Sequence, residues 1–345
     1  MKRLGILTGG GDCPGLNAVI RAVVRKAVDH HSLEVLGIKQ GWVGLMREEL
    51  RPLSLRDISG ILPKGGTILE TSRVNPFTIE DGPRQVQETM QREGIEALIV
   101  VGGEGTLKIA TRFSQMGVNL VGVPKTIDND IARTDLTFGF DTAVAIATEA
   151  IDRLHSTAEA HHRVMVLEVM GRNAGWIATL AGIAGGADCI LIPEAPFTMA
   201  EVCELIMRRH ERGKDFSIIV VAEGAKPPDL GLEESRIWTR YDDFGRKRLG
   251  GIGTLVGNEI EQRCGIETRV TILGHVQRGG SPTPFDRVLA SRFGIAAVDM
   301  VLKGDFGKMV SLQGNKVTAV PLEEAVATYK EVDPELFEIA KIFFG

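Results

Sequence analysis

The residues best suited to chemistry lie in one short string, TIDND, at positions 126–130. An aspartate within reach of a substrate hydroxyl can take its proton while the hydroxyl attacks phosphorus, and a second carboxylate can address a cation. We therefore interpret Asp128 and Asp130, with the hydroxyl of Thr126 as a donor to phosphate, as candidates for phosphoryl transfer. An Asx turn or a helix cap is the structural alternative for these residues.

A glycine turn, GGEGT at positions 102–106, precedes this string by about one βα unit. An apolar run ends in the turn and a helix-like segment follows, so free backbone N–H groups and the positive end of a helix dipole are available to a phosphate. Glycines allow close backbone approach, and Glu104 offers a carboxylate to Mg²⁺. A solvated turn is the alternative. Similar turns occur in lipid kinases and NAD kinases, so this turn alone selects no substrate.

A second glycine turn, GGGDCPGLN, begins at Gly9. It lacks the Lys-Ser/Thr pair of a Walker A loop and the spacing of a dinucleotide fingerprint, so phosphate contact and a tight structural turn both stay open. Cys13 in this turn is either a reactive thiol or a small filler, and we favour the filler.

Several cations accompany these turns. Guanidinium groups match phosphate oxygens in two-point contacts, and most of the set falls near predicted strand ends. Any one of them alone would be an ordinary surface charge, whereas their shared placement favours a sugar-phosphate pocket. The residues are Arg73, Arg163, Arg172, Arg269, His275 and Arg278.

Strand and helix patterns alternate along the chain, which predicts an α/β fold of two doubly wound three-layer α/β/α domains. The first series has strands at 3–8, 33–38, 97–101 and 119–123, with helices at 16–28 and 142–154. The second series contains RVMVLEV, AGWIATLAGIA, CILIP, a helix from a Thr198/Glu201 capping box to Gly213, and FSIIVVAEG. Residues 225–250 interrupt the rhythm, and a helix at about 284–303 follows them.

The composition of the 345-residue chain is that of a soluble enzyme, with 43% hydrophobic and 25% charged residues. A net charge of −5 argues against a nucleic-acid partner. No apolar run approaches the roughly 20 residues that a membrane span needs, and the N-terminus reaches glycine too early for a signal peptide. We expect a cytoplasmic protein. Its four cysteines form no C-x-x-C pair, which is typical of reduced thiols.

Five motifs together carry a family resemblance. GGGDCPGLN, GGEGT, PKTIDND, MGRNAGW and GHVQRGGSP, in this order and spacing, resemble the 6-phosphofructokinase family over nearly the whole chain, and most closely its bacterial ATP-dependent type. The resemblance implies two domains with the active site in the cleft between them. It also implies the glycolytic phosphorylation of fructose 6-phosphate at its 1-hydroxyl, to fructose 1,6-bisphosphate. We expect the donor domain at 1–139 plus about 277–327, and the sugar-phosphate domain at 140–276 plus about 328–345.

The resemblance also implies roles for single residues. Asp128 would be the general base, with Thr126 and Asp130 beside the transferred phosphate, and Glu104 would be the Mg²⁺ ligand. The implied catalytic residues are Asp128, Thr126, Asp130, Arg73 and Arg172. Those implied for the phosphoryl donor are Gly11, Arg73, Gly102, Gly103, Glu104, Gly105, Thr106 and Lys125. Those implied for the sugar phosphate are Thr126, Asp128, Arg163, Met170, Gly171, Arg172, Glu223, Arg269, His275 and Arg278.

Two residues give opposite indications about the donor. In this family a glycine directly after the acidic residue, which is position 105 here, leaves room for a nucleotide. Pyrophosphate-dependent members have Asp at that position, and they also have Lys as the second residue of the PKTIDND motif. This chain combines Gly105 with Lys125. We favour ATP, because a buried Asp at position 105 would crowd and repel the phosphates of a nucleotide, and this chain has glycine there. A flexible lysine at position 125 can accompany either donor. Pyrophosphate is the alternative. Glu104 stands where the family more usually has Asp, and it keeps the carboxylate for Mg²⁺.

The resemblance further implies an allosteric homotetramer or homodimer, with Arg163 and Arg269 reaching into a neighbouring subunit's site. Arg21, Arg25, Lys214 and Asp188 match effector-site positions, whereas His155 and Gly60 depart from them. A catalytically silent sugar-phosphate or nucleotide sensor is a third hypothesis. The complete set of Asp128, Asp130 and Glu104 argues against it, because a sensor needs the cations but not a base and a metal ligand.

Overall fold

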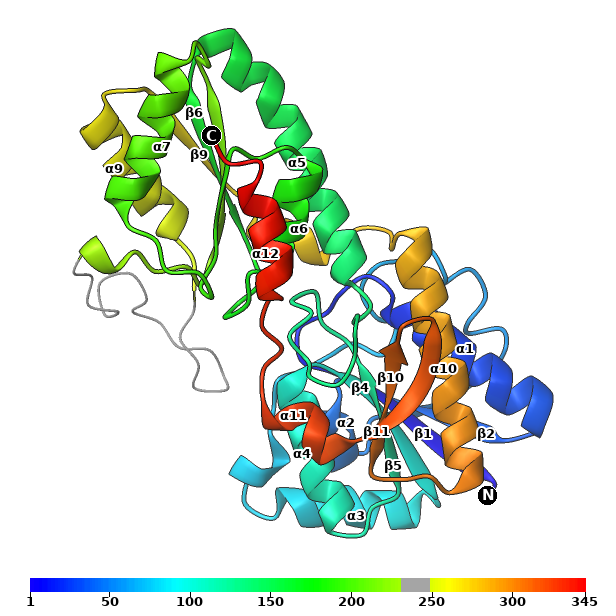
Figure 1. The fold of residues 1–345 in the computed structure, drawn as a ribbon. Coiled ribbons are helices and arrows are strands. Elements are labelled where there is room, and N and C mark those ends of the chain that lie inside the picture. The colour runs from blue at the N-terminus through cyan, green and yellow to red at the C-terminus, as the bar shows by residue number, and fades with distance from the viewer. Residues whose placement is uncertain (231–248) are drawn as a thin grey trace. The chain divides into compact units, whose positions relative to one another are not determined.

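The computed structural model describes residues 1–230 and 249–345, so most of the predicted excursion at 225–250 lies outside the described residues. The chain forms two compact units (Figure 1). Unit 1 consists of Met1–Asp141 and Arg278–Tyr329, and unit 2 of Thr142–Gln277 and Lys330–Gly345. The chain therefore passes from one unit to the other three times, after residues 141, 277 and 329.

Unit 1 is built on a seven-stranded sheet in the order β11-β10-β5-β4-β1-β2-β3. Its central strands are parallel, and the two edge strands β3 and β11 are antiparallel to their neighbours. β4 is buried along its whole length, as expected for a strand covered on both faces. The strands are β1 (Arg3–Gly9), β2 (Glu34–Ile38), β3 (Leu50–Leu53), β4 (Ala97–Gly102), β5 (Leu120–Pro124), β10 (Lys308–Gln313) and β11 (Lys316–Pro321).

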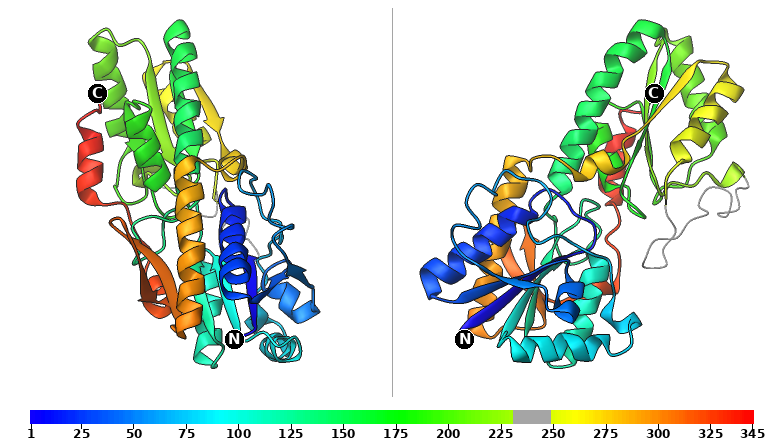
Figure 2. Two further views of the ribbon diagram at one scale, coloured as in Figure 1. Left: turned by 90° about the vertical axis from the view of Figure 1, so that its right-hand side faces the viewer. Right: turned by 180° about the vertical axis from the view of Figure 1, so that it is seen from behind.

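Helices cover both faces of this sheet. α1 and α10 pack against each other on one face, and Figure 2 shows them side by side. A cluster that includes Trp42, Val86 and Phe113 joins α2, α3, α4 and α11 on the other face. The helices are α1 (Leu16–Val24), α2 (Trp42–Arg47), α3 (Gly82–Arg92), α4 (Glu104–Gln115), α10 (Pro284–Lys303) and α11 (Leu322–Ala327), with a π-helical turn at Arg25–Asp29 and a 3₁₀ turn at Pro76–Thr78.

Unit 2 has a four-stranded, all-parallel sheet in the order β7-β8-β6-β9. A core cluster joins α7 and α9 to one face, and α5 and α6 lie over the other (Figure 1). The strands are β6 (Val164–Val169), β7 (Cys189–Leu191), β8 (Ser217–Ala222) and β9 (Thr268–Ile272). The helices are α5 (Phe140–His161), α6 (Trp176–Ala184), α7 (Met199–Glu211), α9 (Ile252–Cys264) and α12 (Pro334–Lys341), with 3₁₀ turns at Pro228–Leu230 and Gly274–Arg278.

The predicted α/β architecture is confirmed, and some elements differ in length or were missed. The capping box of α7 is present: Glu201 N–H donates to Thr198 Oγ1 over 3.2 Å, and Thr198 N–H donates to the Glu201 carboxylate over 2.7 Å. The helix predicted at 142–154 is longer, Phe140–His161. The glycine- and proline-rich stretch from Gly41 to Phe77, whose composition predicts loops and short elements, contains the short α2 and β3, whereas α3 beyond it was not predicted. Among the described residues, no helix is both long and apolar enough to span a bilayer.

Candidate functional site

The two glycine turns and the TIDND string of unit 1 meet at the carboxyl edge of its sheet. In the sheet register Gly9 of β1 lies opposite Gly102 of β4, and Gly102 lies opposite Pro124 of β5. After β1 the chain builds β2 and β3 on one side and then crosses to β4 on the other side. Ligands of open α/β sheets bind at such a switch point. The structure thus brings all three motifs to one edge within unit 1.

The glycines let the start of α4 approach the strand ends closely. Gly103 is the N-cap residue of α4, and Glu104 lies in its first turn. A Cβ on Gly9 would stand 2.8 Å from Cγ2 of Thr106, and a Cβ on Gly102 would overlap the Thr106 side chain. Only glycine at both strand ends leaves room for Thr106. The first N–H groups of α4 consequently face the edge where a phosphate would bind.

Glu104 is only 8% exposed, and its carboxylate forms an ion pair with Lys108 one helical turn later. Among the described residues, no group of three or more His, Cys, Asp or Glu side chains gathers in a form that could hold a metal ion. A single carboxylate fits Mg²⁺, because this ion commonly takes one or two protein carboxylates and fills its other positions with water and substrate phosphates. Glu104 therefore fits a Mg²⁺ that arrives with a phosphoryl donor.

Asp128 lies in a buried loop and is itself 4% exposed. Its N–H donates to Thr126 Oγ1 over 3.1 Å, and the Thr126 hydroxyl lies 3.3 Å from Oδ2 of the same aspartate. Within the described part of the chain, the other carboxylate oxygen, Oδ1, is buried and has no hydrogen-bond partner. A buried acceptor without a partner costs stability and is best explained by a group that the site receives. A substrate hydroxyl is such a group.

The loop around Asp128 is held by hydrogen bonds from its neighbours. Asn129 has a positive φ of 51° and is fully buried, and its Oδ1 accepts the Thr137 N–H at 3.1 Å. The Thr137 hydroxyl donates to Thr126 O over 2.7 Å. Asparagine tolerates the left-handed conformation better than most residues, and these hydrogen bonds hold it there. Asp130, also buried at 7% exposure, lies in the same loop.

Lys125 connects this loop to the first glycine turn. Its side chain is 3% exposed and its ammonium donates to Gly11 O. Burial lowers the pKa of Lys125 from its ordinary value. Arg278 reaches the same turn, where its Nη1 donates to Asp12 O over 3.2 Å, and a Cβ on Gly11 would overlap its guanidinium.

Cys13 lies in the first glycine turn, and Arg73 follows a residue that this turn contacts. The Gly10 N–H donates to Ser72 O over 2.9 Å, which places the neighbouring Arg73 beside the first glycine turn. Cys13 is fully buried, and burial raises the pKa of its thiol to about 12. The thiol donates to Phe138 O over 3.6 Å. A buried thiol with a raised pKa is a poor nucleophile, which supports the interpretation of Cys13 as a filler.

In unit 2, four of the predicted sugar-phosphate residues follow the carboxyl ends of β6 and β8, namely Met170, Gly171, Arg172 and Glu223. The Arg172 N–H donates to Oε1 of Glu223 over 3.1 Å, and the Glu223 N–H donates to Val169 O over 2.8 Å. Arg172 has a positive φ of 54°, and Gly171 has a φ of 141° with no room for a Cβ beside Ala174 O. Strained backbone of this kind clusters at binding loops. His275 follows β9 in the turn Gly274–Arg278.

Arg163 and Arg269 do not join that group within unit 2. Arg163 immediately precedes β6, and Arg269 lies opposite Met165 near the start of the same strand. Both guanidinium groups pair with Glu267, with Arg163 Nε 2.9 Å from its carboxylate. They therefore lie at the amino edge of the sheet, at the opposite end of β6 from Met170 and Arg172.

The predicted effector-site residues form ordinary internal contacts. Asp188 pairs with Arg209 at 2.7 Å and accepts the Ile218 N–H at 2.8 Å, and burial raises its pKa. The His155 ring lies 2.8 Å from Gly185 O. Nothing in these contacts points to an effector, so allosteric control stays a prediction.

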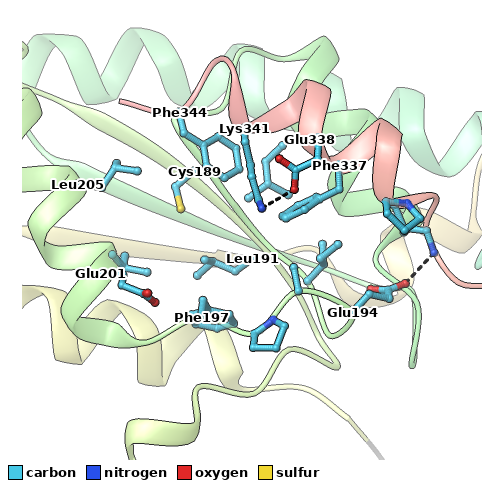
Figure 3. A pocket seen from close by; sticks show the side chains of 17 residues that line it. Cys189, Leu191, Glu194, Phe197, Glu201, Leu205, Phe337, Glu338, Lys341 and Phe344 are labelled. Atoms are coloured by element: carbon cyan, nitrogen blue, oxygen red, sulfur yellow. Dashed lines mark hydrogen bonds and ion pairs between the residues drawn. The ribbon is translucent and has the colours of Figure 1, made fainter.

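A cavity of about 490 Å³ lies elsewhere in unit 2, between β7, α7 and α12 (Figure 3). Its walls include Leu191, Phe197, Phe337 and Phe344, and none of the predicted site residues lines it. Glu194 lies at one end of this cavity. No sequence pattern singles out Glu194, whose carboxylate accepts the N–H groups of Gly175 and Val332.

Comparison with known proteins assigns the family. A family model described as Phosphofructokinase matches residues 3–301. The chain belongs to the phosphofructokinase family. A solved phosphofructokinase from Saccharomyces cerevisiae superimposes with a TM-score of 0.83 at 32% identity, covering 99% of this chain and 47% of the yeast chain. The predicted family and the two-domain α/β fold are thereby confirmed, and phosphofructokinase activity follows as the general function.

Full-length relatives carry two different donor names. A pyrophosphate–fructose 6-phosphate 1-phosphotransferase of Amycolatopsis mediterranei (strain S699) is 55% identical over 99% of this chain and 100% of its own length. An ATP-dependent 6-phosphofructokinase of Mycobacterium leprae (strain TN) is 52% identical over the same shares of the two chains. Similarity to these phosphofructokinases therefore does not choose between the two donors.

Proposed function

We propose that this phosphofructokinase transfers the γ-phosphoryl group of ATP to the 1-hydroxyl of fructose 6-phosphate. The observation that carries the choice of ATP is Gly105, the second residue of α4, at the edge where the donor phosphates would bind. The position carries no side chain in a turn whose N–H groups suit phosphate. A nucleotide has an α-phosphate and a ribose to accommodate beyond the two phosphates of pyrophosphate, so the missing side chain favours the larger donor.

The chemistry is assigned to residues of unit 1. Asp128 takes the proton of the attacking hydroxyl, because its Oδ1 is buried without a partner and its Oδ2 is oriented by Thr126. The N-terminus of α4 and the ammonium of Lys125 offset the negative charge of the donor phosphates. Positioning and charge stabilisation supply most of the acceleration in such transfers.

Mg²⁺, when bound with the donor, supplies charge neutralisation between the phosphates. Glu104 is the residue that would hold it, since its carboxylate lies in the first turn of α4. The ion pair with Lys108 orients that carboxylate and would weaken as a divalent cation approaches.

Unit 2 is proposed to hold the sugar phosphate through the loop of Met170, Gly171 and Arg172, together with Glu223 and His275. Arg163 and Arg269 are proposed to act on a neighbouring subunit, because they lie at the opposite edge of the unit 2 sheet from Arg172. The protein would then be a homo-oligomer, and we place it in the cytoplasm as a glycolytic enzyme.

Pyrophosphate is the second candidate donor. Its support is the buried ammonium of Lys125 at the first glycine turn, together with the donor name of the Amycolatopsis relative. Pyrophosphate concentrates its charge on a small molecule and has no nucleoside to add affinity, so a buried cation matters more for it than for ATP.

Replacing Lys125 with methionine tests the weight of that cation. Methionine nearly matches the volume of lysine and removes a charge that burial disfavours, so we expect a folded protein. Loss of a charge-assisted contact should raise KM for a pyrophosphate donor roughly 10- to 100-fold, and KM for ATP by less. Steady-state kinetics with each donor measure both values. An unchanged KM for both donors would remove Lys125 from the donor site.

The reaction itself is tested by product analysis. Purified protein, fructose 6-phosphate, Mg²⁺ and ATP should yield a sugar bisphosphate whose new phosphate is on C1 by ³¹P and ¹³C NMR. Chelation of Mg²⁺ with EDTA should stop its formation. Tight sugar-phosphate binding without turnover on either donor would contradict the proposal and would favour the sensor hypothesis.

A further inference from the structure

The loop at residues 170–175, here called the sugar loop, is held by two carboxylates, one near its middle and one at its end. On one side Glu223 accepts the Arg172 N–H at 3.1 Å. On the other side Glu194 accepts the Gly175 N–H, with its two oxygens at 2.9 and 3.0 Å from the nitrogen. Because the loop contains positive φ values at Gly171 and Arg172, its shape depends on such anchors.

Glu194 is suited to this position. Gly175 is the N-cap residue of α6, and no side chain of its own caps the helix. A carboxylate at a helix N-terminus satisfies free N–H groups and interacts favourably with the helix dipole. A Cβ on Gly175 would overlap Ile192 and stand 2.9 Å from Oε2 of Glu194, so the glycine allows the close approach.

The same carboxylate holds a second segment of the chain. Oε1 of Glu194 accepts the Val332 N–H at 3.1 Å. Trp176, which follows Gly175 in the chain, donates its indole N–H to Lys330 O over 3.0 Å. The Lys330 ammonium lies 4.8 Å from the centre of the indole ring. Lys330 is the first residue after the chain passes from unit 1 to unit 2 for the last time. Residues 175–176 and 330–332 are thus linked twice, once through the Glu194 carboxylate and once by the direct hydrogen bond from Trp176 to Lys330.

We propose that Glu194 is a positioning residue for fructose 6-phosphate, which fixes the sugar loop by bonding its end to residues 330–332. It contacts backbone N–H groups and acts on the substrate only through Arg172 and its neighbours. Trp176, next to Gly175, strengthens the link between the end of the sugar loop and residues 330–332 through its own hydrogen bond to Lys330 O. This inference rests on the proposed function, because it assumes that the loop binds the sugar phosphate.

Glu194→Gln is the decisive variant. Glutamine keeps the size of the side chain but offers one oxygen acceptor and brings an NH₂ group toward a backbone N–H. A loop displaced by a fraction of an ångström should raise KM for fructose 6-phosphate roughly tenfold. We expect kcat and KM for the donor to change less than about threefold, since the donor edge belongs to unit 1.

The matched control is Asp229→Asn. Asp229 also accepts a single helix-start N–H, that of Met199 in α7, with its two oxygens at 3.1 and 3.0 Å from the nitrogen. It does not contact the sugar loop by any hydrogen bond among the described residues. This variant should lower Tm to a similar degree and leave KM for fructose 6-phosphate unchanged, which separates loss of stability from loss of positioning.

A second variant, Trp176→Phe, keeps the ring but removes the donor to Lys330 O. It should raise KM for fructose 6-phosphate by less than Glu194→Gln, and the two changes together should be less than additive. It also stands in for Glu194→Gln if that protein does not fold. The thermal shift produced by added fructose 6-phosphate, measured on every variant, gives binding independently of turnover.

The outcomes separate the two claims. If wild-type protein turns over fructose 6-phosphate and both loop variants keep its KM and thermal shift, the positioning role is overturned and the proposed function stands. If wild-type protein neither binds nor turns over fructose 6-phosphate, the proposed function fails and this inference fails with it. A raised KM in the loop variants alone supports the role.

Discussion

Replacing Asp128 with alanine is expected to lower kcat by ~10²–10⁴, the usual contribution of a general base. KM for fructose 6-phosphate should change little, because most of the residues proposed to hold the sugar phosphate lie in unit 2 and keep their contacts. The loss of kcat is expected because the buried Oδ1 of Asp128 is free to accept the proton of the substrate hydroxyl. Among the described atoms of Thr126 and Asp128, it is the only acceptor without a partner. Steady-state rates over a range of sugar concentrations give kcat and KM separately.

Asp135→Asn is the matched control for this variant. Asp135 lies in the same loop region, is exposed, and its carboxylate accepts the Gly314 N–H at 2.6 Å. It should keep kcat within about twofold of wild type, as expected for an exposed position away from the chemistry. Near-wild-type turnover of the Asp128→Ala protein would remove Asp128 from the role of base.

Replacing Gly105 with aspartate is expected to lower kcat/KM for ATP by about 10²–10³. Two like charges 4–5 Å apart repel by roughly 3–4 kcal/mol at an effective dielectric constant near 20, and nucleotide phosphates would bind beside this residue. The fold should tolerate the change, because an acidic residue in the first turn of a helix is stabilising. Use of pyrophosphate should fall much less.

Gly105→Ala separates crowding from charge. Alanine adds a methyl group with no charge, so a small loss with alanine and a large loss with aspartate would attribute the effect to repulsion. Equal losses with the two variants would attribute it to space. Unchanged ATP kinetics in Gly105→Asp would show that position 105 does not face the donor, which would withdraw the main support for ATP.

The sequence predicted the parts of the fold that depend on continuous apolar runs. β1, β4 and β6 are buried parallel strands, and such strands appear as unbroken hydrophobic segments. The meeting of GGEGT and TIDND followed from the same pattern, since carboxyl ends of neighbouring parallel strands share one edge. Binding motifs at these strand ends can therefore be placed from the sequence.

Elements that are stabilised mainly by their neighbours were not predicted. α3 buries only Gly82, Val86, Thr89 and Met90 and is otherwise polar, so its apolar stripe is narrow. α2 has six residues and β3 four, lengths at which local preference is weak and tertiary packing decides. The glycines and prolines nearby predicted only loops and short elements, and the packing of Trp42 against Phe113 is a contact between distant segments that no local pattern shows.

Contacts between distant segments also lay beyond the sequence. The bond from Lys125 to Gly11 O depends on the path of one side chain across a strand end. Glu194 lies in the string PEAPF, which has the composition of a surface turn, and its two bonds to Gly175 and Val332 exist only in the folded chain. No spacing rule connects these three positions, so their shared role required the structure.

The central claim is tested most directly by comparing donors on the purified wild-type protein. Initial rates with fructose 6-phosphate would be measured over matched concentrations of ATP·Mg²⁺ and of pyrophosphate·Mg²⁺. We predict that kcat/KM for ATP exceeds that for pyrophosphate by roughly tenfold or more. A tenfold ratio corresponds to about 1.4 kcal/mol, which is the size of one favourable contact that ATP makes and pyrophosphate does not. Turnover with pyrophosphate and none with ATP would contradict the assignment of Gly105 and, with it, the proposed donor.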